Sequence, residues 1–169
     1  MRVFVEQQKF DMLWMRLLMG IILLGSVIPI ISTLSESSRE QPAQVFTLVT
    51  TICIVVALTV FMLFVVHLKT RIDEQGVGYG FYPFRRKLRQ TPWSEIQNIQ
   101  VREYSAISEF GGWGFKISWF GRKGVSYTIR GKHGIQLELN SGKRILIGTQ
   151  KQSEAEAVIH YYTTSREVD

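Results

Sequence analysis

Hydrophobic and polar positions divide the chain near residue 68. Residues 45–68 contain no charged side chain, and as a helix at about 1.5 Å per residue they would be roughly 36 Å long. A bilayer hydrocarbon core is about 30 Å thick. A buried helix of a soluble protein would need a large surrounding core, which the remaining residues cannot supply. The pattern therefore predicts a transmembrane helix over about residues 45–68.

A second apolar stretch over about residues 12–31 predicts another transmembrane helix, so the two would form a short hairpin. Arg16 lies near the start of this stretch, where a long cationic side chain can reach the membrane interface. Trp14 is beside it, and we interpret both as membrane-interface anchors. The alternative is a cleaved signal peptide, but no small-residue cleavage site follows Pro29.

The distribution of charge predicts the orientation of this hairpin. Between the two apolar stretches, residues 32–44 contain Arg39 as their one positive charge, and the whole net charge of +6 resides in residues 69–169. The positive-inside rule then places both termini in the cytoplasm and the link outside. We expect a multi-pass protein with two spans in an inner or plasma membrane.

Beyond residue 68 the hydrophobic period changes to two, which is typical of β-strands. Gly-rich and Asn-rich turn signals separate the alternating segments, and Glu74-Gln75-Gly76 reads as a hairpin turn. About seven short strands are predicted. They cover residues 70–73, 77–81, 87–91, 96–104, 125–130, 135–139 and 143–148.

One amphipathic helix is predicted to close the chain. Ser153 and Glu156 have the spacing of a capping box, and an apolar stripe follows at helical spacing, made of Ala155, Val158, Ile159 and Tyr162. The predicted fold class is an α+β membrane protein. It combines a two-helix transmembrane hairpin in residues 1–68 with a small split β-barrel of antiparallel strands in residues 69–169, capped by the C-terminal helix.

Several short segments follow the second apolar stretch, namely Thr70-Arg71-Ile72-Asp73 with Gly76, Tyr82-Pro83, Pro92-Trp93-Ser94-Glu95-Ile96, Gly111-Gly112-Trp113-Gly114 and Leu146-Ile147-Gly148-Thr149-Gln150. Together with the two-helix hairpin, their order and spacing resemble the bacterial pleckstrin-homology-like membrane proteins. Such a resemblance implies a PH-like barrel in a membrane setting, acting as an interaction or assembly module, sometimes in homo-oligomers. The short acidic turn at Glu74 argues against a phosphoinositide pocket in the first hairpin loop.

A basic run follows the first predicted hairpin and is the strongest charge feature of the chain. It should lie near the bilayer, where each cation gains about 1 kcal/mol from an anionic leaflet. Two alternatives remain open. The cations could belong to a solvated loop and reflect only the general excess of Lys and Arg on the cytoplasmic side of a membrane protein. They could also bind nucleic acid, although no aromatic residues for base stacking accompany the run. The lipid-surface candidates are Arg85, Arg86, Lys87 and Arg89.

An aromatic, glycine-rich segment spans residues 110–120 and holds the candidate partner contacts, Trp113 and Phe110. Trp113 lies between glycines in a predicted loop, where partner contact and simple packing are both open. Phe115, Ile117 and Trp119 alternate as a short strand would, and we expect them to fill the barrel.

No catalytic constellation is found in the sequence. His67, His133 and His160 are scattered without metal-ligand spacing, and the single Cys53 allows no intrachain disulfide. We therefore predict a non-enzymatic protein without metal or cofactor, which binds the lipid bilayer and a protein partner or a second copy, and no nucleic acid. The alternative function is binding or sensing of anionic lipid through the basic run.

Overall fold

The chain folds into two compact units. The computed structural model describes residues 2–10, 13–36, 42–117 and 124–167. One unit comprises residues 10–66, and the other joins residues 1–9 to residues 67–169. The first nine residues therefore belong to the same unit as the segment that follows the helices, whereas the sequence had suggested one boundary near residue 68.

The unit of residues 10–66 consists of two helices, α1 (Leu13–Glu36) and α2 (Pro42–Phe64), which contact each other. Pro42 occupies the first position of α2, where its missing N–H costs little. Threonine hydroxyls along α2 donate to backbone carbonyls four residues earlier, at 2.8–2.9 Å, so that these polar groups are satisfied within the helix. These residues are Thr47, Thr50, Thr51 and Thr59.

One stretch in the described residues is long and apolar enough to cross a membrane. It is Phe46–Phe64, with 19 residues and a mean hydropathy of 2.6, and it would span about 28 Å. No stretch of the described residues in α1 meets the same test. The predicted hairpin of two transmembrane helices is therefore wrong. The predicted end at residue 68 was also too late, because Leu68 is fully buried in the sheet that follows α2.

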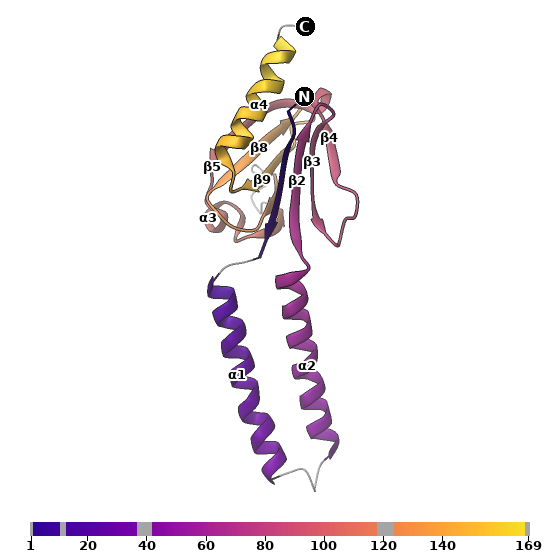
Figure 1. Ribbon diagram of the computed structural model, residues 1–169, viewed down its shortest axis with the longest axis vertical. Coiled ribbons are helices and arrows are strands. Elements are labelled where there is room, and N and C mark those ends of the chain that lie inside the picture. The colour runs from indigo at the N-terminus through magenta and orange to yellow at the C-terminus, as the bar shows by residue number, and fades with distance from the viewer. Residues whose placement is uncertain (1, 11–12, 37–41, 118–123, 168–169) are drawn as a thin grey trace. The chain divides into compact units, whose positions relative to one another are not determined.

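The other unit contains two β-sheets, and Figure 1 shows the strands of the first lying side by side. The first sheet has four antiparallel strands, and the second has five, with one parallel pair between β7 and β9. The first sheet has the order β1 (Phe4–Lys9), β2 (His67–Asp73), β3 (Gly76–Tyr82) and β4 (Arg89–Pro92). The second has the order β5 (Ile96–Glu103), β8 (His133–Leu139), β9 (Arg144–Thr149), β7 (Val125–Thr128) and β6 (Gly114–Ile117).

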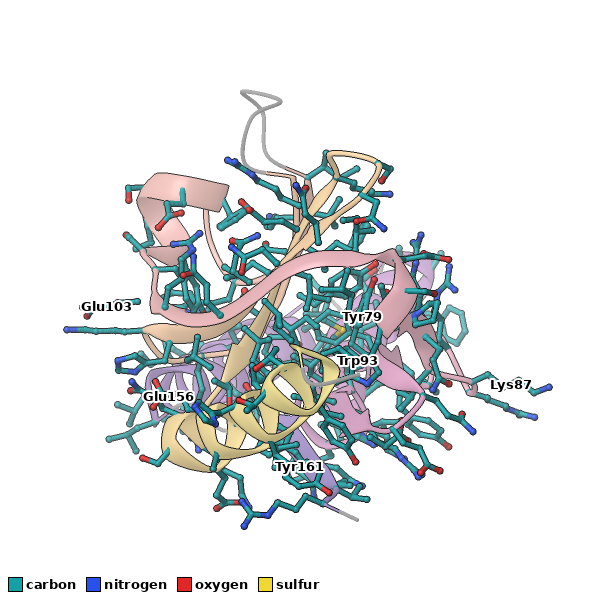
Figure 2. The ribbon with its side chains drawn as sticks, turned by 90° about the horizontal axis from the view of Figure 1, so that it is seen from above. Tyr79, Lys87, Trp93, Glu103, Glu156 and Tyr161 are labelled. Carbon is teal, nitrogen blue, oxygen red and sulfur yellow. The ribbon has the colours of Figure 1, made fainter. Side chains whose placement is uncertain are left out.

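Aromatic and branched aliphatic side chains fill the core between the sheets. The rings of Tyr79 and Tyr127, one from each sheet, lie 4.9 Å apart in an edge-on arrangement. Trp93, in the short 3₁₀ turn η1 (Trp93–Glu95) between the sheets, donates from its indole Nε1 to the Asp73 carbonyl at 2.8 Å. Tyr79 and Trp93 are marked in Figure 2. Other fully buried side chains are Leu68, Ile72, Ile129, Ile135, Leu137 and Ile147.

Strand β1 joins the two sheets through side chains. Its backbone pairs with β2, and its inward residues Glu6 and Gln8 are buried. Glu6 accepts hydrogen bonds from the Thr149 hydroxyl at 2.6 Å and from the Gln150 N–H at 2.8 Å. Gln8 donates to the Gly148 carbonyl at 2.7 Å.

The predicted split barrel of antiparallel strands is therefore wrong. The described residues form two open sheets and no closed barrel. The physical reason is visible at β1, which faces β9 with carboxylate and amide side chains instead of a backbone ladder.

The C-terminal helix α4 (Gln152–Glu167) packs against β5, β8 and β1. The predicted apolar stripe is confirmed, since Ala155, Val158 and Ile159 are buried. Tyr162 places its ring 5.4 Å from Trp93 and donates to the Arg2 carbonyl. The predicted capping box is wrong, because the helix already begins at Gln152 and Ser153 lies inside its first turn.

Candidate functional site

The basic run lies in the connection between β3 and β4, at one end of the first sheet. At this end His67 pairs with both Lys9 and Tyr82. Lys9 and His67 flank residues 10–66, so this is the end from which the chain enters and leaves the helical unit; we call it the helix-connected end. Figure 1 shows the β3–β4 connection at this same end of the sheet.

All four predicted cations are exposed and close together in the chain. We define them as the basic loop, namely Arg85, Arg86, Lys87 and the first residue of β4, Arg89. Figure 2 shows Lys87 extending away from the rest of the domain. None of the four forms an ion pair with an acidic side chain of the described residues, so the charge is available to an external partner.

Leu88 and two glycines hold the basic loop against β3. A Cβ atom at Gly78 would lie 3.3 Å from the Leu88 side chain, and one at Gly80 would lie 3.7 Å from Arg85 Cβ. The two small residues thus leave room for Leu88 to pack on the strand. The N–H of Arg85 also donates to the Phe81 carbonyl at 2.8 Å, which folds the loop back at the end of the sheet.

An aromatic cavity adjoins the basic loop. It has a volume of about 290 Å³ and is lined by Phe81, Phe84, Arg85, Phe115 and Tyr127. The Phe115 and Tyr127 rings lie 5.1 Å apart, and the Phe81 and Tyr127 rings lie 6.1 Å apart. Phe84 is 68% exposed and Phe115 is 54% exposed. The cavity therefore has an aromatic floor and two exposed aromatic walls beside a guanidinium group.

The expectation that the alternating aromatic trio fills a barrel is wrong for the two described members. Phe115 and Ile117 belong to β6, and both are exposed. Trp119 lies outside the described residues. The alternation correctly predicted that Phe115 and Ile117 lie on the same face of a strand. It could not predict that this face lies outside the core.

The other aromatic candidates occupy different surroundings. Phe110 is buried in a cluster with Tyr104, Ala106 and Leu146, so it is a core residue and has no surface for a partner. Trp113 packs on this cluster and remains partly exposed. Trp14 and Arg16 fall on the first turn of α1, and their side chains lie outside the part of the chain that the structure describes.

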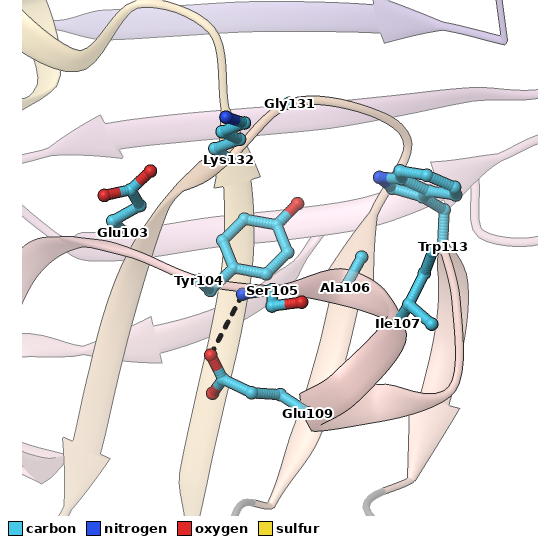
Figure 3. Close-up of a pocket in the computed structure, with 9 residues that line it drawn as sticks. All are labelled: Glu103, Tyr104, Ser105, Ala106, Ile107, Glu109, Trp113, Gly131 and Lys132. Carbon is cyan, nitrogen blue, oxygen red and sulfur yellow. Dashed lines mark hydrogen bonds between the residues drawn. The ribbon is translucent and has the colours of Figure 1, made fainter.

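Trp113 also lines a second cavity, of about 530 Å³, which Figure 3 shows. Helix α3 (Ala106–Phe110) forms one wall, and Glu109 on it accepts from the Ser105 N–H at 3.0 Å and pairs with Arg102 at 2.9 Å. The remaining charged lining groups are Glu103 and Lys132, of opposite sign. This cavity therefore offers no net charge to a ligand.

Two buried polar atoms belong to residues that line the second cavity, Tyr104 and Trp113. Neither Tyr104 Oη nor Trp113 Nε1 has a hydrogen bond of normal geometry within the described residues. Burial raises the pKa of Tyr104 to about 12, and the neighbouring Thr128 hydroxyl lowers that pKa in part. Both atoms are closed off from solvent.

The described residues contain no cluster of three or more His, Cys, Asp or Glu side chains suited to a metal ion. Comparison of the chain with protein-family models, curated proteins and solved structures found no match. The site must therefore be interpreted from its own chemistry. That chemistry is a set of exposed cations next to exposed aromatic rings.

Proposed function

We propose that this chain is a membrane-anchored, non-enzymatic binding module of the bacterial pleckstrin-homology-like kind. In this proposal α2 is inserted in a membrane, and the basic loop binds the anionic surface of that same membrane. The single observation that supports it best is the register of His67 with Tyr82, because it places the basic loop at the helix-connected end.

Chain length supports a short distance between the loop and the bilayer. Only Val65 and Val66 separate the end of α2 from β2, a connection of at most about 11 Å at 3.8 Å per Cα step. Electrostatic attraction in physiological salt extends over about 8 Å. Cations at this end of the sheet would therefore lie where an anionic leaflet attracts them.

The distribution of charge bears on orientation. The excess of Lys and Arg beyond residue 68 favours the cytoplasmic side of an inner or plasma membrane. The residues that follow α2 would then be cytoplasmic.

The full-length chain in lipid nanodiscs tests this function. Backbone amides of residues 84–90 are followed by hydrogen exchange in discs of phosphatidylcholine alone and in discs with added phosphatidylglycerol. We expect stronger protection in the anionic discs, weakened by salt. The double variant R86Q/K87Q should lose about 2 kcal/mol of attraction, or about 30-fold in the docking equilibrium.

A matched double variant, K143Q/K151Q, removes the same charge from two exposed sites outside the basic loop. It should retain the difference between the two kinds of disc. Equal protection in both lipids for the unaltered chain would exclude binding of the loop to the anionic surface.

A second candidate function is binding of a protein partner or of a second copy. The observation in its favour is the second cavity, where the partly exposed Trp113 lies beside charged groups of both signs. Mass measurement of the intact complex in mild detergent distinguishes the candidates. A discrete oligomer or a stoichiometric second protein supports partner binding, and a monomer with bound lipid supports the lipid function.

A further inference from the structure

The aromatic cavity exposes more apolar surface than a domain in water favours. Burying one phenylalanine side chain gains about 1.5–3 kcal/mol, yet Phe84 and Phe115 leave more than half of their surfaces exposed on one cavity. Contiguous exposed apolar side chains on a small domain mark a surface that another molecule covers.

The cation in the same cavity indicates what kind of molecule that is. Arg85 contributes to the lining together with the four aromatic rings. A guanidinium group binds phosphate through two N–H donors, and aromatic rings lie favourably at the level of lipid headgroups. The combination fits an amphiphile that carries a phosphate next to an apolar portion.

The position of the cavity supports a lipid over a soluble amphiphile. Phe81 pairs with Leu68, one residue from the helix-connected end, and Phe84 and Arg85 lie in the β3–β4 connection at that end. Tyr82 at the same end has the Lys69 ammonium 5.1 Å from its ring centre and the His67 ring 4.9 Å away. Cations and aromatic rings thus share the part of the domain that continues into the hydrophobic helices.

We propose that the aromatic cavity binds one anionic phospholipid of the surrounding leaflet. The apolar portion of the lipid lies between Phe84 and Phe115, and Arg85 binds its phosphate. This inference rests on the proposed function and adds to it, since general attraction of the basic loop to a charged surface needs neither phenylalanine nor any bound lipid.

Photo-crosslinking from the cavity wall tests the proposal in the full-length chain. Benzoylphenylalanine replaces Phe84, the protein is placed in nanodiscs of phosphatidylcholine and phosphatidylglycerol, and adducts are identified by mass spectrometry after irradiation. The matched control carries the same group at Tyr161, an exposed aromatic position on α4. Its neighbour Tyr162 donates to the carbonyl of Arg2, which precedes β1 and so lies by the end of that strand opposite to the helix-connected end.

We expect a lipid adduct from position 84, at least several-fold enriched in phosphatidylglycerol over its share of the disc, and none from position 161. The variant R85Q should lose the enrichment while hydrogen exchange of β9 remains unchanged, which shows that the domain is still folded.

Three results would overturn the proposal. If the two lipids form adducts in proportion to their share of the disc, Arg85 does not select an anionic phosphate. If the adducts form with a second protein chain, the cavity is a protein interface. Absence of any adduct at position 84, while amides of residues 84–90 stay protected on anionic discs, would reject the cavity and leave the proposed function intact. If that protection is also absent, the lipid site in the aromatic cavity and the proposed function are both rejected.

Discussion

Replacement of Glu6 by alanine tests how β1 is held on the domain. The Glu6 carboxylate is 5% exposed and receives two hydrogen bonds, from the Thr149 hydroxyl and the Gln150 N–H. A hydrogen bond to a charged group contributes about 1.5–3 kcal/mol. Part of this is recovered, since Gln150 is an exposed residue whose N–H can bind water once the part-buried hydrogen bond to Glu6 is lost. We therefore expect E6A to lower the free energy of unfolding by about 2–4 kcal/mol.

The more conservative variant E6Q should cost about 1 kcal/mol, because its amide oxygen can still accept from Gln150. As a control, E154A removes a carboxylate of α4 whose side chain is 61% exposed and pairs with Lys151, and it should change stability by less than about 0.5 kcal/mol. The assay is urea unfolding of the detergent-solubilised full-length chain, with hydrogen exchange of β1 and β9 amides. If E6A is as stable as E154A, the Glu6 contacts do not hold β1 in place.

The remaining predictions concern a turn and a buried hydroxyl. Gly76 has φ of +136°, and a Cβ there would lie 2.1 Å from the Thr91 carbonyl oxygen, so G76A should cost about 2–4 kcal/mol in urea unfolding. G142A, with φ of +76° and no atom within 4 Å of the added Cβ, should cost only about 1–2 kcal/mol, and equal losses would contradict the clash. For Tyr104, with a folded pKa of about 12 against an ordinary value of 10.0, the unfolded chain loses its proton first as pH rises. Stability should therefore decline from pH 10 towards pH 12 by about 1.4 kcal/mol per pH unit. Y104F should remove that part of the pH dependence and be nearly neutral at pH 7, and an unchanged profile would contradict the assignment.

The sequence predicted the later strands and the final helix well, because their inward positions are apolar and their turns contain glycine. The strand β1 was missed for a specific reason. Two of its three inward residues are Glu6 and Gln8, which read as solvent-exposed in any hydrophobic pattern. Their burial depends on Gly148 and Thr149, 140 and 143 positions away.

The same limit applies to the candidate site. The basic loop could be found from its charges, whereas the aromatic cavity could not, since it combines β3, the β3–β4 connection, β6 and β7. Phe110 was predicted to contact a partner and Phe115 to fill the core, yet Phe110 is buried and Phe115 is exposed. Alternation identifies which residues share a face of a strand, and only tertiary packing decides which face is covered.

The separation of β1 from β2 has a consequence for biosynthesis. The strand formed by residues 4–9 leaves the ribosome before its partner β2, which follows only after the whole of residues 10–66 has been made. Pairing over such a sequence distance is slow, because a long loop must close before any contact forms. Until then Glu6 and Gln8 have no partners. Completion of the first sheet therefore has to wait for synthesis of the helical unit. A chain in which β1 is paired with β2 is one in which this unit has been made in full.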